Sequence, residues 1–166
     1  MHHDPAPNVG MPLGIRAATP EDASALAELA RAAYSVYLPR LPVGVRPAPL
    51  DADYAATVHR DEVWVVDRGR RISGFVVLVR QPDHLLLENI AVHPDFQGQG
   101  IGGALLSLAE EQAVSRGIPS IRLYTHAVMV ENQRLYEHLG YVVTARTTEG
   151  GFDRVFYEKQ IRAITP

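Results

Sequence analysis

A glycine-rich segment just past the middle of the chain carries the residue types of an anion-binding loop. Four glycines, at positions 98, 100, 102 and 103, follow the apolar run Leu85 to Val92. Glycines leave the backbone N–H groups around them unobstructed, and the first turn of a helix adds unpaired N–H groups and the positive end of the helix dipole. Residues 86–103 therefore predict a strand, a short turn and a loop that opens a helix and cradles a phosphate, most naturally a pyrophosphate.

Two phosphate-binding motifs fit these glycines. Gly98, Gly100 and Gly103 satisfy G-x-G-x-x-G, the fingerprint of NAD(P)-binding domains. That fingerprint should follow its strand directly, whereas residues 93–97 intervene here. It also requires an acidic residue about 20 residues later to bind a ribose hydroxyl, and residues 121–126, IRLYTH, contain no carboxylate. These features, and the position of the loop past mid-chain, weigh against a nicotinamide dinucleotide.

The second motif is Q-x-x-G-x-G, formed by Gln97, Gly100 and Gly102. Within IAVHPDFQGQGIGGALL, it resembles motif A of the GCN5-related N-acetyltransferases. Residues 130–143, VENQRLYEHLGYVV, resemble motif B of that family, a short helix that carries a tyrosine and ends in Leu-Gly-Tyr. That ending alone is also typical of a helix C-cap before a strand, but its place one helix and one strand after motif A favours the family. The resemblance covers roughly residues 63–161, and the N-terminal third matches in its pattern of elements alone.

The resemblance implies both a fold and an activity. The fold is that of the acyl-CoA N-acyltransferases, of the α/β (α+β) class, with a central mixed, largely antiparallel sheet and helices on both faces. The activity is transfer of the acetyl group of acetyl-CoA directly to a primary amine, without a covalent enzyme intermediate and without a metal. The alternative is a non-catalytic, acyl-CoA-binding regulatory module with the same fold.

Length and composition exclude several other classes. With 166 residues the chain is long enough for one self-sufficient domain, which we expect at residues 13–162 behind a flexible N-terminal arm at residues 1–12. The absence of cysteine excludes disulfides, thiolate metal sites and a cysteine nucleophile. The net charge of −3 and the mixed charges predict no nucleic-acid partner. No apolar stretch reaches the ~18 residues of a membrane span and no apolar signal core begins the chain, so we expect a cytoplasmic protein without a membrane partner.

Periodicity and turn residues give the order of elements, β-α-α-β-β-β-α-β-α-β-β. In the N-terminal part, Thr19 and Pro20 begin a helix whose buried face carries Leu26, Leu29, Ala30 and Ala33. Four prolines make residues 38–50 irregular, and a short helix capped by Asp51 follows to about residue 59. The remaining elements are predicted as a hairpin of residues 63–67 and 72–79, a strand at 85–92, a helix at 100–116 ended by Gly117, a strand at 118–125, a helix at 131–139, and a hairpin of 141–148 and 152–161.

The resemblance also assigns residues to the cofactor. The loop wraps the pyrophosphate through backbone N–H groups, and the strand before it binds the pantetheine arm as an added strand would. Asn132 is placed to hydrogen-bond that arm, although the family more often has the asparagine seven residues before the tyrosine, where this chain has Met129. The predicted cofactor-binding residues are Ile90, Ala91, Val92, Gln97, Gly98, Gln99, Gly100, Ile101, Gly102, Gly103 and Asn132.

Two residues are predicted to move protons. Tyr136 holds the position of the family tyrosine that protonates the departing thiolate, and a phenol with a pKa of about 10 is protonated at neutral pH. Glu88 is a carboxylate within an apolar strand, which is unusual without a role. By the two-residue period it shares a face with Ile90 and Val92, so it is the leading candidate for the base that deprotonates the amine. The alternatives are an ordered water, His84, His93 and His126.

The acceptor is the least determined part of the prediction. In this fold the irregular segment lies over the acceptor site, so Tyr34, Tyr37, Arg40 and Arg46 are candidates to meet the substrate, and the two arginines favour an acceptor with a carboxylate. A protein N-terminus, a lysine, a polyamine, an amino acid and an aminoglycoside all remain open. The family often forms homodimers, and the closing hairpin offers a free edge for one.

Overall fold

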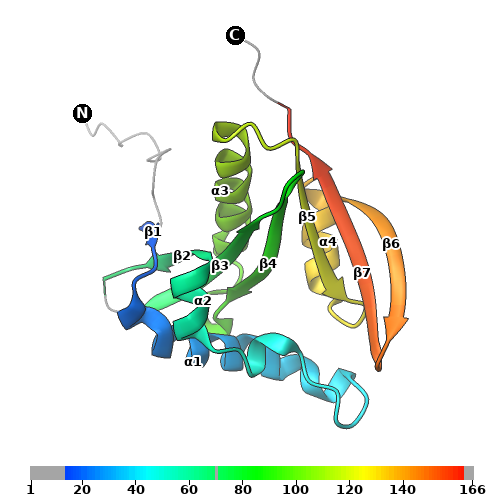
Figure 1. The fold of residues 1–166 in the computed structure, drawn as a ribbon. Helices are drawn as coiled ribbons and strands as arrows, with labels where there is room; N and C mark the ends of the chain where they lie inside the picture. The colour runs from blue at the N-terminus through cyan, green and yellow to red at the C-terminus, as the bar shows by residue number, and fades with distance from the viewer. Residues whose placement is uncertain (1–13, 70, 163–166) are drawn as a thin grey trace, which may run out of the picture.

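The computed structural model describes residues 14–69 and 71–162, which form one seven-stranded sheet flanked by helices (Figure 1). The flexible arm expected at residues 1–12 lies outside the described residues. The strand order is β1-β2-β3-β4-β5-β7-β6. The strands are β1 (Ile15–Ala17), β2 (Glu62–Asp67), β3 (Ile72–Arg80), β4 (Leu85–Val92), β5 (Ser120–His126), β6 (Val142–Glu149) and β7 (Phe152–Gln160).

The helices occur in the predicted order along the chain. Within the described ranges four are α-helices, and short 3-10 segments of three or six residues precede or follow them. The α-helices are α1 (Ala23–Tyr34), α2 (Tyr54–Arg60), α3 (Ile101–Ser115) and α4 (Val130–His138), and the 3-10 turns are η1 (Pro20–Asp22), η2 (Ser35–Arg40), η3 (Ala48–Leu50) and η4 (Pro94–Phe96). The order β-α-α-β-β-β-α-β-α-β-β is thus confirmed, and so is the left-handed Gly117 (φ 66°) after α3.

Two hydrophobic cores hold the helices against opposite faces of the sheet. On one face, α1 buries Leu26 and Leu29 in a core with Phe75 of β3, and α2 adds Tyr54. On the other face, α3 buries Leu105 against strands on both sides of the sheet centre, and α4 adds Tyr136. Burial of these apolar side chains is the main favourable contribution to folding, and it fixes the sheet between two layers of helix.

The centre of the sheet opens between β4 and β5. Every other neighbouring pair of strands is antiparallel, whereas β4 and β5 are parallel and pair only through Leu85 with Ile121 and Leu86 with Arg122. Beyond these pairs the two strands diverge, as Figure 1 shows near the middle of the sheet. The C-terminal part of β4 therefore keeps backbone groups that no neighbouring strand satisfies on that side.

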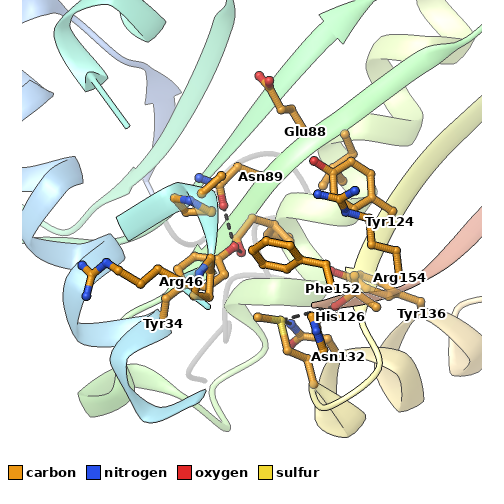
Figure 2. A pocket seen from close by; sticks show the side chains of 17 residues that line it. Tyr34, Arg46, Glu88, Asn89, Tyr124, His126, Asn132, Tyr136, Phe152 and Arg154 are labelled. Carbon is orange, nitrogen blue, oxygen red and sulfur yellow. Dashed lines mark hydrogen bonds between the residues drawn. The ribbon is translucent and has the colours of Figure 1, made fainter. Parts of the chain in front are cut away.

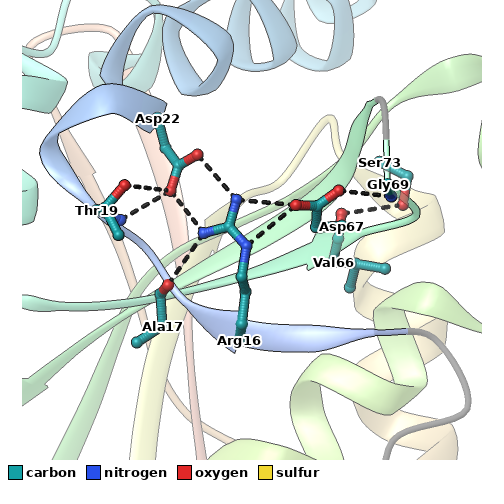
Figure 3. Close-up of polar contacts among 8 residues, drawn as sticks. All are labelled: Arg16, Ala17, Thr19, Asp22, Val66, Asp67, Gly69 and Ser73. Carbon is teal, nitrogen blue, oxygen red and sulfur yellow. Dashed lines mark hydrogen bonds and ion pairs between the residues drawn. The ribbon is translucent and has the colours of Figure 1, made fainter.

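A charged cluster joins the first strand to the rest of the sheet (Figure 3). Arg16 of β1 donates to both carboxylate oxygens of Asp22, at 2.8 and 3.0 Å, and to Asp67 at the end of β2. Asp22 also accepts from the backbone N–H of Thr19 at 2.7 Å, which caps the turn before α1. This arrangement lowers the pKa of Asp22 to about 2, chiefly through its hydrogen bonds with Arg16.

The predicted cap of α2 was wrong by two residues. The helix begins at Tyr54, and Asp53 is its N-cap, whose carboxylate accepts from the backbone N–H of Ala56 at 3.1 Å. Asp51 instead forms a two-point ion pair with Arg46. Because both aspartates can cap a helix, only the tertiary partner of Asp51 distinguishes them. Among the described residues no helix is long and apolar enough to cross a membrane.

Candidate active site

Two cavities meet in the opening between β4 and β5. One has a volume of about 590 Å³ and lies along the glycine-rich loop and the start of α3. The other has a volume of about 280 Å³ and lies between β4, β5 and β7 (Figure 2). Four residues line both cavities, and they mark the point at which the contents of the two can touch: Tyr34, Ile90, Asn132 and Tyr136.

The glycine-rich loop has the backbone that an anion cradle requires. Gly98 and Gly100 have φ values of 80° and 79°, which only glycine adopts without strain. Gly100 directly precedes α3, so the unpaired N–H groups of that helix face the larger cavity. A Cβ atom at Gly103 would point into open space, whereas one at Gly102 would lie 3.4 Å from Cδ2 of Leu135.

Ten of the eleven predicted cofactor residues line the larger cavity. The exception is Gln99, whose side-chain oxygen accepts from Arg68 in the turn after β2 at 3.1 Å. Ile101 contributes through its backbone, since its side chain is buried in the core beneath α3. The loop and the strand end that the sequence indicated are thus brought to one cavity.

The backbone of β4 is directed into the opening at alternate residues. The backbone N–H of His93 donates to Ser73 of β3. Backbone groups of successive residues in an antiparallel strand point to opposite sides, so those of Val92 and Ile90 point away from β3, toward β5. The carbonyl of Ile90 accepts from the hydroxyl of Tyr34 at 3.0 Å, which agrees with this direction.

Tyr136 of α4 lies at the junction of the cavities with an uncommitted hydroxyl. Its ring is 3% exposed and packs between Tyr141 and Tyr157. The hydroxyls of Tyr34 and Tyr157 are hydrogen-bonded, whereas that of Tyr136 has no partner among the described residues. Burial raises the pKa of the Tyr136 phenol, so the group remains a proton donor at neutral pH.

Asn132 lies one helical turn before Tyr136 and also lines both cavities. Its amide nitrogen has one weak contact, with the sulfur of Met129 at 3.8 Å. Met129 itself is 5% exposed and packs in the core beneath α1. Position 129, where the resemblance leads one to expect an asparagine, therefore holds a core residue, and Asn132 is a side-chain amide at the junction of the two cavities.

Comparison with known proteins identifies the family to which this chain belongs. Residues 59–143, about half of the chain, match the family described as Acetyltransferase (GNAT) domain. The chain belongs to the GNAT acetyltransferase family. The ribosomal protein bS18-alanine N-acetyltransferase of Escherichia coli (strain K12) is 35% identical over 71 residues, which are 43% of this chain and 48% of that protein. The chain thus matches about half the length of its curated relatives.

Solved structures confirm the predicted GNAT fold over most of the chain. The crystal structure of the ribosomal-protein-S18-alanine N-acetyltransferase from Escherichia coli matches 92% of this chain and 95% of that one, with a TM-score of 0.71 and 23% identity. The PaiA N-acetyltransferase from Thermoplasma acidophilum, solved in complex with coenzyme A, matches 88% of this chain and 97% of that one, with a TM-score of 0.76 and 23% identity.

In this GNAT domain the predicted orientation of Glu88 was wrong. Asn89 pairs with Val77 and Leu87 pairs with Leu78, so Glu88 is an extra residue that forms a β-bulge. The bulge breaks the two-residue period, so Glu88 does not share the face of Ile90 and Val92. Glu88 lines the smaller cavity, but its carboxylate points away from Tyr136 in Figure 2. Burial and then the nearby Asp61 raise its pKa.

The alternative bases occupy different places. His126 lines the smaller cavity and is 7% exposed, with its Nδ1 and Nε2 atoms 3.2 and 3.1 Å from the backbone nitrogens of Val128 and Asp153. His84 and His93 line neither of the two cavities. His84 lies beside Asp83 in the turn before β4. Among the described residues, no group of three or more His, Asp or Glu side chains could hold a metal ion.

The irregular segment after α1 contributes to both cavities. Tyr34 reaches the junction, where its hydroxyl donates toward Asn89 at 2.6 Å. Tyr37 and Arg40 line the larger cavity and not the smaller one. Arg40 is bound by both carboxylate oxygens of Glu131. Of the two arginines predicted to meet the acceptor, only Arg46 lines the smaller cavity, and it is paired with Asp51.

Sequence reasoning missed most of the wall that β5 and β7 contribute to the smaller cavity. These residues alternate along their strands and share one face of the sheet, a pattern that could have grouped them. Nothing in the sequence shows that this face is left uncovered beside the opening, because that depends on where α1 and α2 pack. The missed residues of β5 and β7 are Tyr124, Phe152 and Arg154, and Asn89 of β4 was missed as well.

Proposed function

We propose that this protein is an N-acetyltransferase that transfers the acetyl group of acetyl-CoA directly to a primary amine. The observation that carries the proposal is the meeting of two cavities at Tyr136, one along the glycine-rich loop and one between β4, β5 and β7. A direct transfer needs both substrates present at once, in contact at one point. Two cavities that share four lining residues offer that arrangement without a covalent enzyme intermediate.

The larger cavity is the proposed site of acetyl-CoA. The N–H groups of Gln97 to Gly103 and the start of α3 suit the pyrophosphate, and the outward backbone groups of Ile90 and Val92 suit the amides of the pantetheine arm. Asn132 is then placed to hydrogen-bond that arm. The coenzyme A bound by the similar PaiA structure supports the choice of ligand.

The proposed reaction uses the junction for bond exchange. The amine nitrogen attacks the thioester carbonyl, the C–N bond forms, and the C–S bond breaks with its electron pair on sulfur. Tyr136 donates its proton to the departing thiolate. A backbone N–H of β4 is suited to stabilise the oxyanion that forms on the way. Glu88 takes the amine proton through water in the smaller cavity, since its carboxylate points away from the junction.

The smaller cavity is the proposed acceptor site. The curated relatives are named for the alanine of ribosomal protein bS18, so a peptide that begins with alanine belongs in any screen of acceptors. Amino acids, polyamines and aminoglycosides complete the set.

The test combines calorimetry and thiol release. Acetyl-CoA should bind to the purified protein, whereas NAD should not, and free thiol should appear when a suitable amine is added. Acetyl-CoA binding without amine-dependent thiol release across the whole library would contradict the enzyme and leave the non-catalytic acyl-CoA-binding module. Failure to bind acetyl-CoA would remove both.

A further inference from the structure

An arginine on β7 faces the smaller cavity without an anionic partner. The guanidinium carbon of Arg154 lies 5.4 Å from the ring centre of Tyr124 and 5.1 Å from that of Phe152. Arg40 and Arg46 each form an ion pair with a carboxylate. Among the described residues no hydrogen bond or ion pair engages the Arg154 side chain, so its guanidinium N–H groups are available to a ligand.

The strand pairing explains why Arg154 is held in this position. It lies directly opposite His126 of β5, and Tyr124 is the diagonal neighbour two residues away on the same face. Phe152 is two residues earlier on β7 itself. Contact with two aromatic rings orients the flat guanidinium, and it leaves the edge that carries the N–H donors open. Figure 2 shows Arg154 beside Tyr124 on the β5–β7 side of the cavity.

The charges of the cavity point to the nature of its ligand. Three of its lining residues carry formal charge: Arg46, Glu88 and Arg154. Asp51 compensates Arg46, so Glu88 on β4 and Arg154 on β7 remain, on opposite sides of the opening. A cavity with one carboxylate and one uncompensated guanidinium suits a polycation poorly, because the acceptor's additional positive charges would meet Arg154. It suits a molecule with an amine and an anionic group.

We propose that Arg154 binds a carboxylate of the acceptor, so that the acceptor is an amine that itself carries a carboxylate. This inference rests on the proposed function and narrows its substrate class. The planar fork of arginine matches a carboxylate through two parallel hydrogen bonds. The apolar body of the acceptor would then lie against Tyr124, Phe152 and Met129. The carboxylate belongs either to a free amino acid or to an acidic residue beside the N-terminus of a peptide.

The experiment compares matched acceptors that carry either a carboxylate or the corresponding neutral amide. The first arm uses ω-amino acids from glycine to 6-aminohexanoate, each against its own amide, which covers a range of distances between amine and carboxylate. The second arm uses short alanyl peptides with glutamate or glutamine at the second position. The thiol-release rate gives kcat and KM for each. The arm in which the acid has a higher kcat/KM than its neutral counterpart identifies the source of the carboxylate.

Arg154→Gln is the decisive variant. It should raise KM for the preferred acid about 10- to 100-fold and leave kcat for that acid nearly unchanged, because the lost contact is equally strong in the bound substrate and in the transition state. Both kcat and KM for the neutral counterpart should change little. Arg154→Lys keeps the positive charge but loses the two-point geometry, so its KM for the acid should lie between those of the wild type and Arg154→Gln. Arg146→Gln is the matched control, since Arg146 is an exposed arginine on neighbouring β6 that lines neither of the two cavities.

Two results would overturn the inference while the proposed function stands. In one, the wild-type protein acetylates acids and their neutral twins equally well. In the other, Arg154→Gln affects both members of each pair alike. If no amine is acetylated, the proposed function fails first, and calorimetry of the same acids and amides with the acetyl-CoA-loaded protein decides the inference. Equal or absent binding of acids and amides there would also overturn it.

Discussion

The two halves of the sheet on either side of the β4–β5 opening are built differently. Strands β1 to β4 are covered on one face by α1 and α2 and on the other by α3. Strand β6 is exposed along its length, whereas β5 and β7 bury residues such as Leu123 and Tyr157 on the α3–α4 face. Their other face keeps Tyr124 43% exposed, and Phe152 and Arg154 partly exposed. The first half is a closed layer, and the second presents a chemically varied surface beside the opening.

This difference separates what is common to the family from what is particular to one protein. On the proposed cofactor side, the groups that would bind the ligand are mainly backbone N–H and C=O groups of the glycine loop and β4, which any sequence that forms the loop provides. On the proposed acceptor side, they would be side chains of β5 and β7. Exchange of those side chains can change the acceptor without disturbing the cofactor site. Mutations on the first side should therefore change the Kd of acetyl-CoA, and mutations on the second should change the kinetic constants for the acceptor.

The largest effect is expected at the junction itself. Tyr136→Phe removes the proposed proton donor and keeps the ring that packs against Tyr141 and Tyr157. The kcat should fall about 100-fold, with little change in the Kd of acetyl-CoA, because the hydroxyl acts on the departing sulfur. Steady-state thiol release and calorimetry measure the two quantities. An unchanged kcat would remove the acid role.

Tyr141→Phe is the matched control for this variant. Tyr141 is also buried next to Tyr136, and its hydroxyl has no hydrogen-bond partner among the described residues. Loss of a buried, unpaired hydroxyl should be neutral or stabilising, and Tyr141 lines neither of the two cavities. A large loss of kcat in this control would show that packing around the tyrosines, and not proton transfer, limits the rate.

A second prediction tests the closed half of the sheet alone. Asp22→Asn removes the carboxylate that Arg16 holds (Figure 3) and should lower the stability at neutral pH by about 2 kcal/mol, since the pKa of Asp22 falls from 3.8 to about 2 on folding. A lowered pKa stabilises the fold above pH 4. The difference between variant and wild type should therefore shrink as the pH falls from 4 to 2.

Urea titrations at several pH values give this comparison, with Glu28→Gln as the control because Glu28 is an exposed carboxylate on α1. The Kd of acetyl-CoA and the kcat should not change in Asp22→Asn. A change in either would mean that the Arg16 cluster communicates with the opening, and that the two halves are less independent than their packing indicates.

The sequence predicts the glycine loop and the elements around it well because their signals are local. Glycines at a strand-to-helix junction, proline and glycine at turns, and a two-residue period define the loop and most strands within a few neighbouring residues. The error at Asp51 has the opposite origin. Its role depends on Arg46, and no propensity distinguishes it from Asp53.

The acceptor side depends on relations that are not local. The bulge at Glu88 follows from the pairing of β4 with β3, so the two-residue period could not place its carboxylate. In the sequence, nothing distinguishes Arg154 from an ordinary strand residue. Its position on the cavity follows from the pairing of β5 with β7 and from the uncovered face of these two strands. The arginines favoured in the sequence, Arg40 and Arg46, have carboxylate partners that only the fold brings to them.

A third prediction concerns the base on the β4 side of the opening. Glu88→Gln should lower kcat about 10-fold, which is below the usual range of general-base effects, because the side chain is exposed and acts through water. Burial and Asp61 raise the pKa of Glu88 above its usual 4.5, so the acidic limb of the wild-type pH profile should lie above that value. The limb should disappear in the variant. A profile identical to that of the wild type would return the role to His126 or to water alone.

The last prediction uses two glycines to separate the cofactor contact from stability. Gly103 lies in the first turn of α3, and a Cβ there would meet nothing in the protein. Gly103→Ala should therefore leave the fold as stable or up to about 1 kcal/mol more stable. The added methyl would occupy space proposed for the pyrophosphate, so the Kd of acetyl-CoA should rise about 10-fold from steric exclusion alone.

Gly117→Ala should show the reverse. Gly117 has a φ of 66° at the other end of α3, so alanine there costs about 1 kcal/mol of stability, and the Kd should not change because the residue lines neither of the two cavities. Thermal unfolding and calorimetry on the two variants place them at opposite corners of a plot of stability against affinity. If Gly103→Ala binds acetyl-CoA as tightly as the wild type, the phosphates do not approach this turn, and the cradle must be confined to the loop before Gly100.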